Sequence, residues 1–205
     1  MTPRRIEKFL AILGAELTVP ARAFLTGAAA AALWGRVRPS LDIDMGIEAL
    51  RGRGAAAWPA IQSAVDRTVR LTGIAASAAG DIDRRGMITL LDYRRTCRLH
   101  ARYDRLEVRL LDPANWAIGK LTRYLDPDVR DVSEVFRRQS VDPKRAARLW
   151  GRALRGSPPS TAQFQFRRNV EAFLRREGRR AWGPGFDPAP VLRAFHRAAG
   201  IPGGK

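Results

Sequence analysis

Asp42 and Asp44 are the residues of this 205-residue chain whose type and spacing point most directly to chemistry. Alternate side chains of a β-strand project from the same face, so on a strand these two carboxylates would project together. Such a pair suits Mg²⁺ or Mn²⁺, because these cations prefer oxygen ligands and are held by one or two carboxylates with phosphate oxygens and water. The chemistry we expect of it is metal-dependent, in-line nucleotidyl transfer.

The stretch from residue 24 to residue 48 predicts the elements that would position the two aspartates. An apolar strand ends at Gly27, an alanine-rich helix begins there, a basic turn containing Arg38 follows, and a second strand carries the aspartates. The first N–H groups of a helix have no partner within the helix, and glycine has no Cβ. Gly27 and Ala28 are therefore candidate backbone donors to a phosphate.

Two blocks of sequence resemble the signature of the polymerase-beta-like minimal nucleotidyltransferases. The first block is Gly27-Ala28 followed by Arg38-Pro39-Ser40-Leu41-Asp42-Ile43-Asp44, and the second is Lys120-x-x-Arg123 followed by Arg130-Asp131-x-x-Glu134. Within that family the chain looks most similar to the abortive-infection (AbiEii-type) nucleotidyltransferase toxins of bacterial toxin–antitoxin pairs and their uncharacterised relatives. The resemblance covers residues 5–140, and it rests on the joint occurrence and order of the two blocks.

The resemblance implies an α+β fold, with a polymerase-beta-like core sheet, flanking helices and a helical C-terminal part. It implies an enzyme that moves a nucleoside monophosphate from a nucleoside triphosphate to an acceptor. In that reading Asp42 and Asp44 are catalytic and bind the metal, and Asp131 holds Lys120 or Arg123. The nucleotide-binding residues would be Gly27, Ala28, Arg38, Ser40, Lys120 and Arg123. Ala28 departs from the family, which has glycine or serine there.

A third carboxylate would complete the site, and the sequence leaves two candidates for it. Alternating apolar residues predict a meander of three strands over residues 87–91, 95–101 and 105–111. Asp92 ends the first of these strands, where the family often has its third acid, and we favour it. Glu107 lies within the third strand, in a region that could lie beside Asp42. A further pair, Asp81 and Asp83, is flanked by glycines and reads as a polar loop.

Helices are predicted on both sides of this core. They span residues 3–14, with Ile6, Phe9, Leu10 and Leu13 on one face, and residues 55–71, 112–125, 143–154, 161–176 and 188–199. In the C-terminal part Phe164, Val170, Phe173 and Leu174 read as packing residues, while Arg167, Arg168, Arg175, Arg176, Arg179 and Arg180 line an exposed side. We divide the chain into a nucleotidyltransferase core, 1–139, and a basic helical part, 140–205.

The net charge of +17 is unevenly placed. Residues 1–136 hold 21 basic and 16 acidic side chains (+5), and residues 137–205 hold 16 basic and 4 acidic ones (+12). Such a surplus attracts polyanions, and with the family resemblance it makes RNA, including the end of tRNA, the acceptor we expect. The abundance of arginine and alanine is also typical of a GC-rich coding sequence, which offers a plainer account of the composition.

A single cysteine and two histidines exclude an internal disulfide and a cysteine-rich zinc site. Charges interrupt the first twenty residues, and the apolar run from residue 23 to residue 35 is too short to cross a bilayer. We therefore expect a cytoplasmic protein without a membrane partner. The resemblance adds a possible antitoxin as a protein partner.

Two other functions stay open. The first is a catalytically inactive protein that keeps the nucleotidyltransferase fold and binds nucleic acid, which Ala28 and the uncertain third acid would favour. The second is an enzyme that modifies a protein or a small molecule such as an aminoglycoside. The basic C-terminal part disfavours this second function, because a cationic drug needs an acidic pocket.

Overall fold

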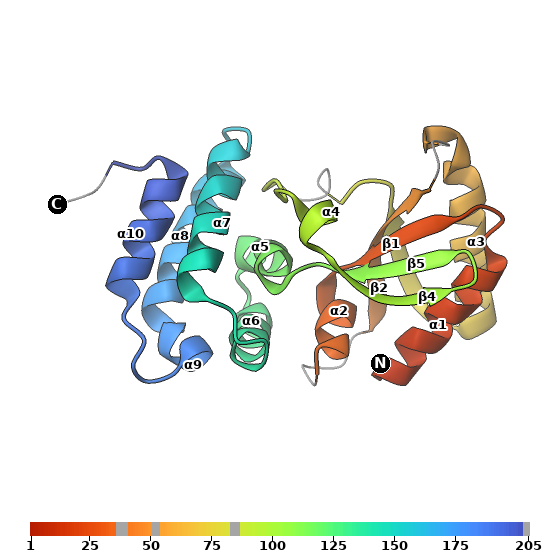
Figure 1. The fold of residues 1–205 in the computed structure, drawn as a ribbon, viewed down its shortest axis with the longest axis horizontal. Helices are drawn as coiled ribbons and strands as arrows, with labels where there is room; N and C mark the ends of the chain where they lie inside the picture. Colours follow the sequence, from red (N-terminus) through yellow and green to blue (C-terminus); the bar gives the residue numbers. More distant parts are fainter. Residues whose placement is uncertain (36–40, 51–53, 83–86, 203–205) are drawn as a thin grey trace. The chain divides into compact units, whose positions relative to one another are not determined.

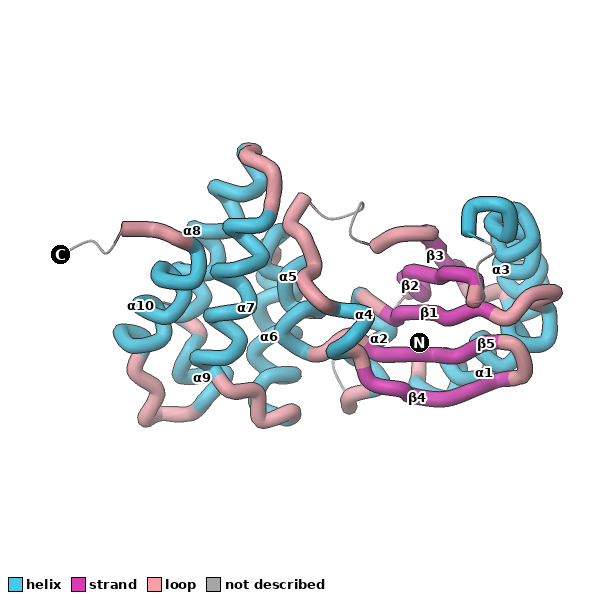
Figure 2. Tube along the Cα trace, turned by 45° about the horizontal axis from the view of Figure 1, so that its top comes forward, coloured by secondary structure: helices cyan, strands magenta, loops and turns pink. Residues whose placement is uncertain are grey.

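The computed structural model describes residues 1–35, 41–50, 54–82 and 87–202, and in it the chain forms two compact units. The first comprises Met1–Ile82 and Arg94–Leu111, and the second comprises Asp83–Tyr93 and Asp112–Lys205. The first unit holds the sheet, and the described part of the second is built of helices and loops (Figures 1 and 2).

The sheet of the first unit has five strands in the order β3-β2-β1-β5-β4 (Figure 2). They are β1 (Ala21–Leu25), β2 (Asp42–Ala49), β3 (Ala75–Ala79), β4 (Arg98–Tyr103) and β5 (Leu106–Leu110). The central strand β1 runs antiparallel to β2 and parallel to β5. β3 is parallel to β2, and β4 is antiparallel to β5. The mixed sheet with its helices confirms the predicted α+β class.

One face of this sheet is apolar and is covered by two amphipathic helices. α1 (Pro3–Glu16) packs on β4 and β5, and α3 (Trp58–Thr72) packs on β2 and β3. The buried residues of α1 include the predicted stripe of Ile6, Phe9, Leu10 and Leu13. Because α3 returns the chain from β2 to a parallel strand, the predicted crossover after residue 55 is confirmed. A short 3₁₀ turn, η1 (Gly54–Ala57), precedes it.

The other face of the sheet is largely polar. In-register neighbours share a face, so Glu48 of β2, Arg22 of β1 and Glu107 of β5 lie in one row across it. Asp44 lies on the same face, because it is an even number of residues from Glu48 on β2. The predicted strand–helix–strand order of β1, α2 (Gly27–Leu33) and β2 is present, and α2 begins at Gly27 as expected, while β1 ends at Leu25.

The strand predicted over residues 87–91 is wrong. This segment has no strand structure and belongs to the second unit. The Thr89 N–H donates to Ser157 Oγ at 2.9 Å, and the Leu91 carbonyl accepts from the Asn115 amide at 3.4 Å. Bonds to side chains therefore take up backbone groups that a β-ladder would have paired. α4 (Tyr93–Thr96) follows, and β4 and β5 form the remaining hairpin of the predicted meander.

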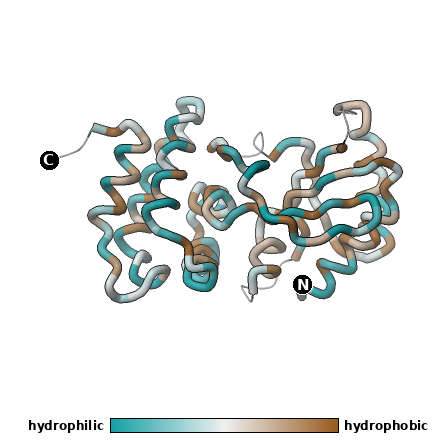
Figure 3. The backbone as a smooth tube through the Cα atoms, in the orientation of Figure 1, coloured by the Kyte–Doolittle hydropathy of each residue, from teal (hydrophilic) through white to brown (hydrophobic). Residues whose placement is uncertain are grey.

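The second unit packs its helices around an aromatic core. Its helices are α5 (Pro113–Arg123), α6 (Asp126–Arg138), α7 (Pro143–Gly156), α8 (Thr161–Arg176), α9 (Gly178–Trp182) and α10 (Pro188–Ala199). Phe136 stacks on Trp150 at 5.7 Å between ring centroids, and Phe173 meets both edge-on at 6.3 Å. Hydrophobic and hydrophilic residues alternate along these helices (Figure 3), as their one-sided burial requires.

Helix boundaries in this unit follow the sequence signals closely. The Asp112 side chain caps α5 by accepting from the N–H groups of Ala114 and Asn115, as predicted for an Asp-Pro start. Val170, Phe173 and Leu174 are buried as expected. Phe164 was predicted to pack and does not: its side chain is 58% exposed, and Phe166 is buried instead. The predicted division of the chain at residue 139 stays a prediction.

None of the helices within the described ranges is long and apolar enough to cross a membrane.

Candidate active site on the sheet

Asp42 and Asp44 both lie on β2, with Ile43 and Met45 buried on the opposite face. Asp42 is exposed and Asp44 is partly buried. The side chains therefore share the polar face, as the spacing of two predicts. On β3 their in-register neighbours are Ala75 and Ser77, so that strand adds no carboxylate at their level.

Gly27 lies directly against Asp44. Its φ of +59° is in the left-handed region that favours glycine. A Cβ placed on Gly27 would come within 2.8 Å of Asp44 Oδ2. The preceding Thr26 donates from its N–H to the Asp44 carbonyl at 3.0 Å and from its hydroxyl to the same oxygen at 3.2 Å. The turn between β1 and α2 thus holds the backbone of Asp44, and the missing Cβ makes room for its carboxylate.

Of the other predicted nucleotide-binding residues, Ala28 is in the first turn of α2, where the sequence expects it. Arg38 and Ser40 lie outside the described residues, and so does Asp83 of the alternative aspartate pair. Asp81, the other member of that pair, lies 4.0 Å from Arg94.

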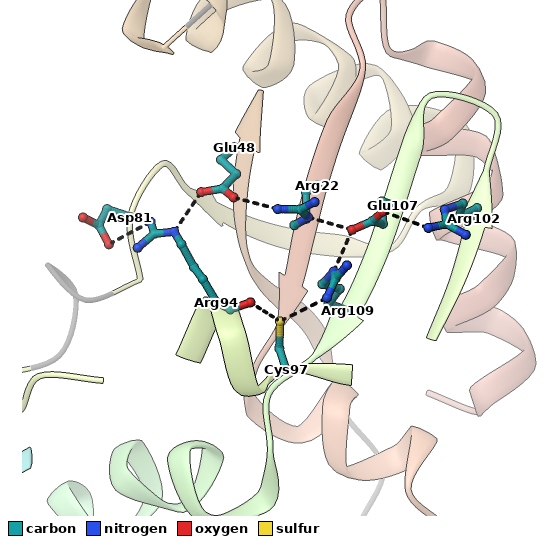
Figure 4. Close-up of polar contacts among 8 residues, drawn as sticks. All are labelled: Arg22, Glu48, Asp81, Arg94, Cys97, Arg102, Glu107 and Arg109. Atoms are coloured by element: carbon teal, nitrogen blue, oxygen red, sulfur yellow. Dashed lines mark hydrogen bonds and ion pairs between the residues drawn. The ribbon is translucent and has the colours of Figure 1, made fainter. Parts of the chain in front are cut away.

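A chain of alternating charges crosses the polar face of the first unit (Figure 4). Arg22 lies between two glutamates, with Nε at 2.7 Å from Glu107 and Nη1 at 3.6 Å from Glu48. Arg94 donates to Glu48 at 3.0 Å and extends the chain to Asp81. Glu48 is four residues from Asp44, or about 13 Å along the strand, so this network is a separate row from the aspartates.

Glu107, the alternative third acid, is the centre of that network. β1 separates its strand from β2, so Glu107 does not lie beside Asp42 as the sequence allowed. Arg22, Arg102 and Arg109 all donate to its carboxylate (Figure 4). The hydrogen bond from Arg109, together with the one from Arg22 and the charges of both guanidinium groups, lowers the pKa of Glu107 to about 2. A carboxylate so fully used by guanidinium groups is a structural ion-pair centre and a poor metal ligand or base.

Asp92, the favoured third acid, does not end a strand as predicted. It occupies a turn with φ of +55° just before α4, and it belongs to the second unit. Its assignment as the third carboxylate stays a prediction.

Lys120 is the centre of a buried charge cluster in the second unit. Its Nζ donates to Asp128 Oδ1 at 2.8 Å and to Asp131 Oδ2 at 2.7 Å, and its side chain is 3% exposed. The predicted support of Lys120 by Asp131 is therefore present. A phosphate at Lys120 would have to displace carboxylates that already satisfy the ammonium, and its predicted nucleotide contact stays a prediction.

Asp128 is the member of this cluster that the sequence reading missed. Arg123 binds it with two bonds of 3.0 Å, from Nε and from Nη2. Burial alone would raise the pKa of Asp128, but the hydrogen bonds from Arg123 and Lys120 hold it below its usual value. The signal was the spacing of Asp128 and Asp131, three apart on α6, which puts both on the face that α5 meets.

Among the residues that the structure describes, no group of three or more histidine, cysteine or acidic side chains is placed to hold a metal ion. The aspartate pair of β2 still fits Mg²⁺ by its chemistry, since this ion takes one or two protein carboxylates and completes its shell with phosphate oxygens and water.

Comparison of the chain with family models, with curated proteins and with solved structures finds no match.

Proposed function

We propose that the chain is a nucleotidyltransferase that moves a nucleoside monophosphate from a nucleoside triphosphate to an acceptor and releases pyrophosphate. The observation that carries the proposal is the placement of Asp42 and Asp44 on one face of β2, with Gly27 directly against the Asp44 carboxylate. A pair of acids beside a glycine turn is the arrangement expected where a phosphate and a divalent cation meet.

In this proposal different residues bind the metal ion and the phosphates. Asp42 and Asp44 would hold Mg²⁺ or Mn²⁺, which when bound supplies charge neutralisation at the triphosphate. Gly27 and Ala28 lie where backbone N–H groups could bind a phosphate oxygen, and Arg38 and Ser40 are further proposed contacts from the segment before β2. Asp44 is held in place through the bonds from Thr26 to its carbonyl.

RNA is the proposed acceptor, with the end of tRNA as the specific candidate. The support is electrostatic, because residues 137–205 carry a surplus of +12. A role as the toxin of a toxin–antitoxin pair in the cytoplasm, with an antitoxin protein as partner, is part of the same proposal and rests on the sequence resemblance alone.

A specific observation favours the second candidate, an inactive nucleotidyltransferase-fold protein that binds nucleic acid. Neither Ala75 nor Ser77 can act as a third acid beside the aspartates, and Glu107 is bound by three arginines. The two candidates share the RNA partner and differ in catalysis.

The deciding experiment incubates the full chain with each of the four labelled nucleoside triphosphates, Mg²⁺ and total RNA, and then asks where label appears. Label on RNA supports transfer. Retention of RNA by the chain without label on RNA or protein, in Mg²⁺ and in Mn²⁺, favours the inactive binding protein. Label on the chain itself or on an added protein instead of RNA removes RNA as the acceptor and keeps the transfer chemistry.

A further inference from the structure

A pocket of about 240 Å³ opens in the second unit among α7, α8, the end of α10 and the residues after it. Its lining includes Arg155, Ser160, Gln163, Phe164, Arg167 and Ile201. They combine an aromatic ring, two guanidinium groups and two side chains that hydrogen-bond. Pockets for drug-sized ligands measure roughly 300–1,000 Å³, so this smaller pocket suits a single nucleotide of a longer polymer rather than a larger enclosed ligand.

Phe164 is more exposed than the other phenylalanines of its helix. Phe166 and Phe173 on the same helix are fully buried, whereas the Phe164 side chain is 58% exposed. The guanidinium of Arg168 lies 5.9 Å from its ring centroid. Unpaired nucleobases usually stack on an exposed aromatic ring that has cations beside it. The ring packs on the apolar face of the base, and the cations attract the anionic backbone of the nucleic acid.

The arginines of the pocket leave positive charge available to a ligand. Arg155 has no carboxylate within ion-pair distance among the described residues. Arg167 bonds Glu171 at 3.1 Å, but Glu171 is also shared by Arg175 at 3.5 Å and His196 at 2.9 Å. The single carboxylate of Glu171 is thus shared by two arginines and a histidine, so the pocket wall remains net positive. This is the charge that a phosphodiester requires.

Gln163 adds a polar group of fixed orientation. Its amide nitrogen donates to the Leu154 carbonyl at 2.7 Å and to the Ser157 carbonyl at 3.2 Å. The amide oxygen is then the group that Gln163 can offer, and it is an acceptor for the amino or imino group of a base. Ser160, whose oxygen accepts from the Gln163 N–H, keeps its hydroxyl proton for a donor bond.

We propose that this pocket binds one nucleotide of a single-stranded RNA, with the base stacked on Phe164 and the flanking phosphates on Arg155 and Arg167. The choice of RNA as the polymer rests on the proposed function, in which RNA is the acceptor. Duplex RNA is excluded as the ligand because its bases are already stacked and paired. Arg175 of α8 and Arg180 of α9 are weaker candidates, since neither lines the pocket.

The test measures binding of a short fluorescein-labelled single-stranded oligoribonucleotide to the full chain by anisotropy at several salt concentrations. Phe164→Ala and Phe164→Leu should each weaken binding about tenfold, and Phe164→Tyr should restore it, because stacking needs a ring. Arg155→Ala should weaken binding and reduce the salt slope by about 0.7, the value for one lost phosphate contact on a single strand.

Matched controls are available within the same unit. Leu125→Ala removes an equally exposed apolar side chain, and Arg175→Ala removes an arginine outside the pocket, so both should bind the oligonucleotide like the unaltered chain. Circular dichroism would verify that Phe164→Leu keeps its helices. Equal affinity of Phe164→Leu and the unaltered chain, or equally strong competition by duplex RNA, would overturn the pocket assignment.

Failure of the pocket and failure of the proposed function give different results. If the oligonucleotide binds through Phe164 while no labelled nucleotide is ever transferred, the proposal for the pocket is supported and the proposal of nucleotidyl transfer is contradicted. If RNA is labelled while the Phe164 variants bind and react normally, transfer stands and the pocket falls.

Discussion

Two aspartate pairs of the chain, one on a helix and one on a strand, differ in setting. Asp128 and Asp131 of α6 are buried and share the ammonium of Lys120, with Arg123 completing the charge balance. Asp42 and Asp44 of β2 lie on the polar face of the sheet, one exposed and the other against a glycine that has no Cβ. The first pair joins α5 to α6 through its cations, whereas the second lies beside the turn between β1 and α2, where the proposed nucleotide would bind. Glu107 shares the polar face with Asp44 and, like Asp128, is bound by more than one cationic side chain.

Asp44→Asn should give the largest effect, reducing nucleotidyl transfer to background while leaving the melting temperature within a few degrees. The change removes a carboxylate ligand without altering side-chain volume. The comparison is with Asp66→Asn, an exposed aspartate on α3 bonded to Gln62, which should keep full transfer. Full transfer by Asp44→Asn, in an assay where the unaltered chain is active, would show that this pair is not the metal site.

Lys120→Ala should destabilise the second unit by about 3–5 kcal/mol, because it leaves two buried carboxylates without their shared cation. Urea unfolding followed by circular dichroism measures the change. Arg123→Ala should cost less, since the Arg123 side chain is 57% exposed and Lys120 would still satisfy Asp128. If the two variants lose equal stability, the cluster is not centred on Lys120.

Glu107→Gln should lower the free energy of unfolding at pH 7 by about 1.5–3 kcal/mol, the usual contribution of hydrogen bonds to a charged group. The pKa of Glu107 is lower in the folded chain than its ordinary 4.5, so its contribution is complete above pH 4.5 and is lost as the pH falls toward 2. The difference between variant and unaltered chain should therefore shrink across that range. Glu16→Gln, which breaks a more exposed pair with Arg67, provides the reference. A gap that stays constant down to pH 2 would contradict the lowered pKa.

Gly27→Ala tests the room beside Asp44, and Gly73→Ala is its matched control. Both glycines have positive φ, +59° and +64°, so both substitutions carry the same backbone cost of about 1 kcal/mol. A Cβ at Gly73 meets nothing within 4 Å, whereas one at Gly27 would press on Asp44 Oδ2. Gly27→Ala should therefore lose about 1 kcal/mol more in thermal unfolding, and it should also impair transfer. Equal losses would mean that the close approach relaxes without cost.

Local signals in the sequence predicted most of the secondary structure. The amphipathic stripe of α1, the Asp112-Pro start of α5 and the spacing of Asp42 and Asp44 on β2 each depend on residues within one helix or one strand, and each is found as expected. The strand prediction for residues 87–91 was wrong, although their pattern matches a strand. Their backbone groups are bonded instead to the side chains of Ser157 and Asn115, which lie far along the chain. Non-local partners leave no trace in a local pattern.

The candidate site shows the same limit. The resemblance implied that Asp131 holds Lys120 or Arg123, but not that a second aspartate, Asp128, would also bind Lys120. Phe164 and Phe166 are two apart on one helix, and choosing which is buried requires the positions of the neighbouring helices. Glu107 does not lie beside Asp42 because its strand, β5, has β1 and not β2 as a neighbour. This strand order could not be derived from the local sequence pattern.

The position of β1 at the centre of the sheet also affects how the chain is made. Its parallel partner β5 follows it by 85 residues, the separation of Arg22 and Glu107. At roughly 5–20 residues per second, a ribosome needs about 4–17 s to add that length. During this interval one edge of β1 has no strand beside it, and the apolar face beneath β4 and β5 cannot close. This long-range pairing predicts slow folding of the finished chain.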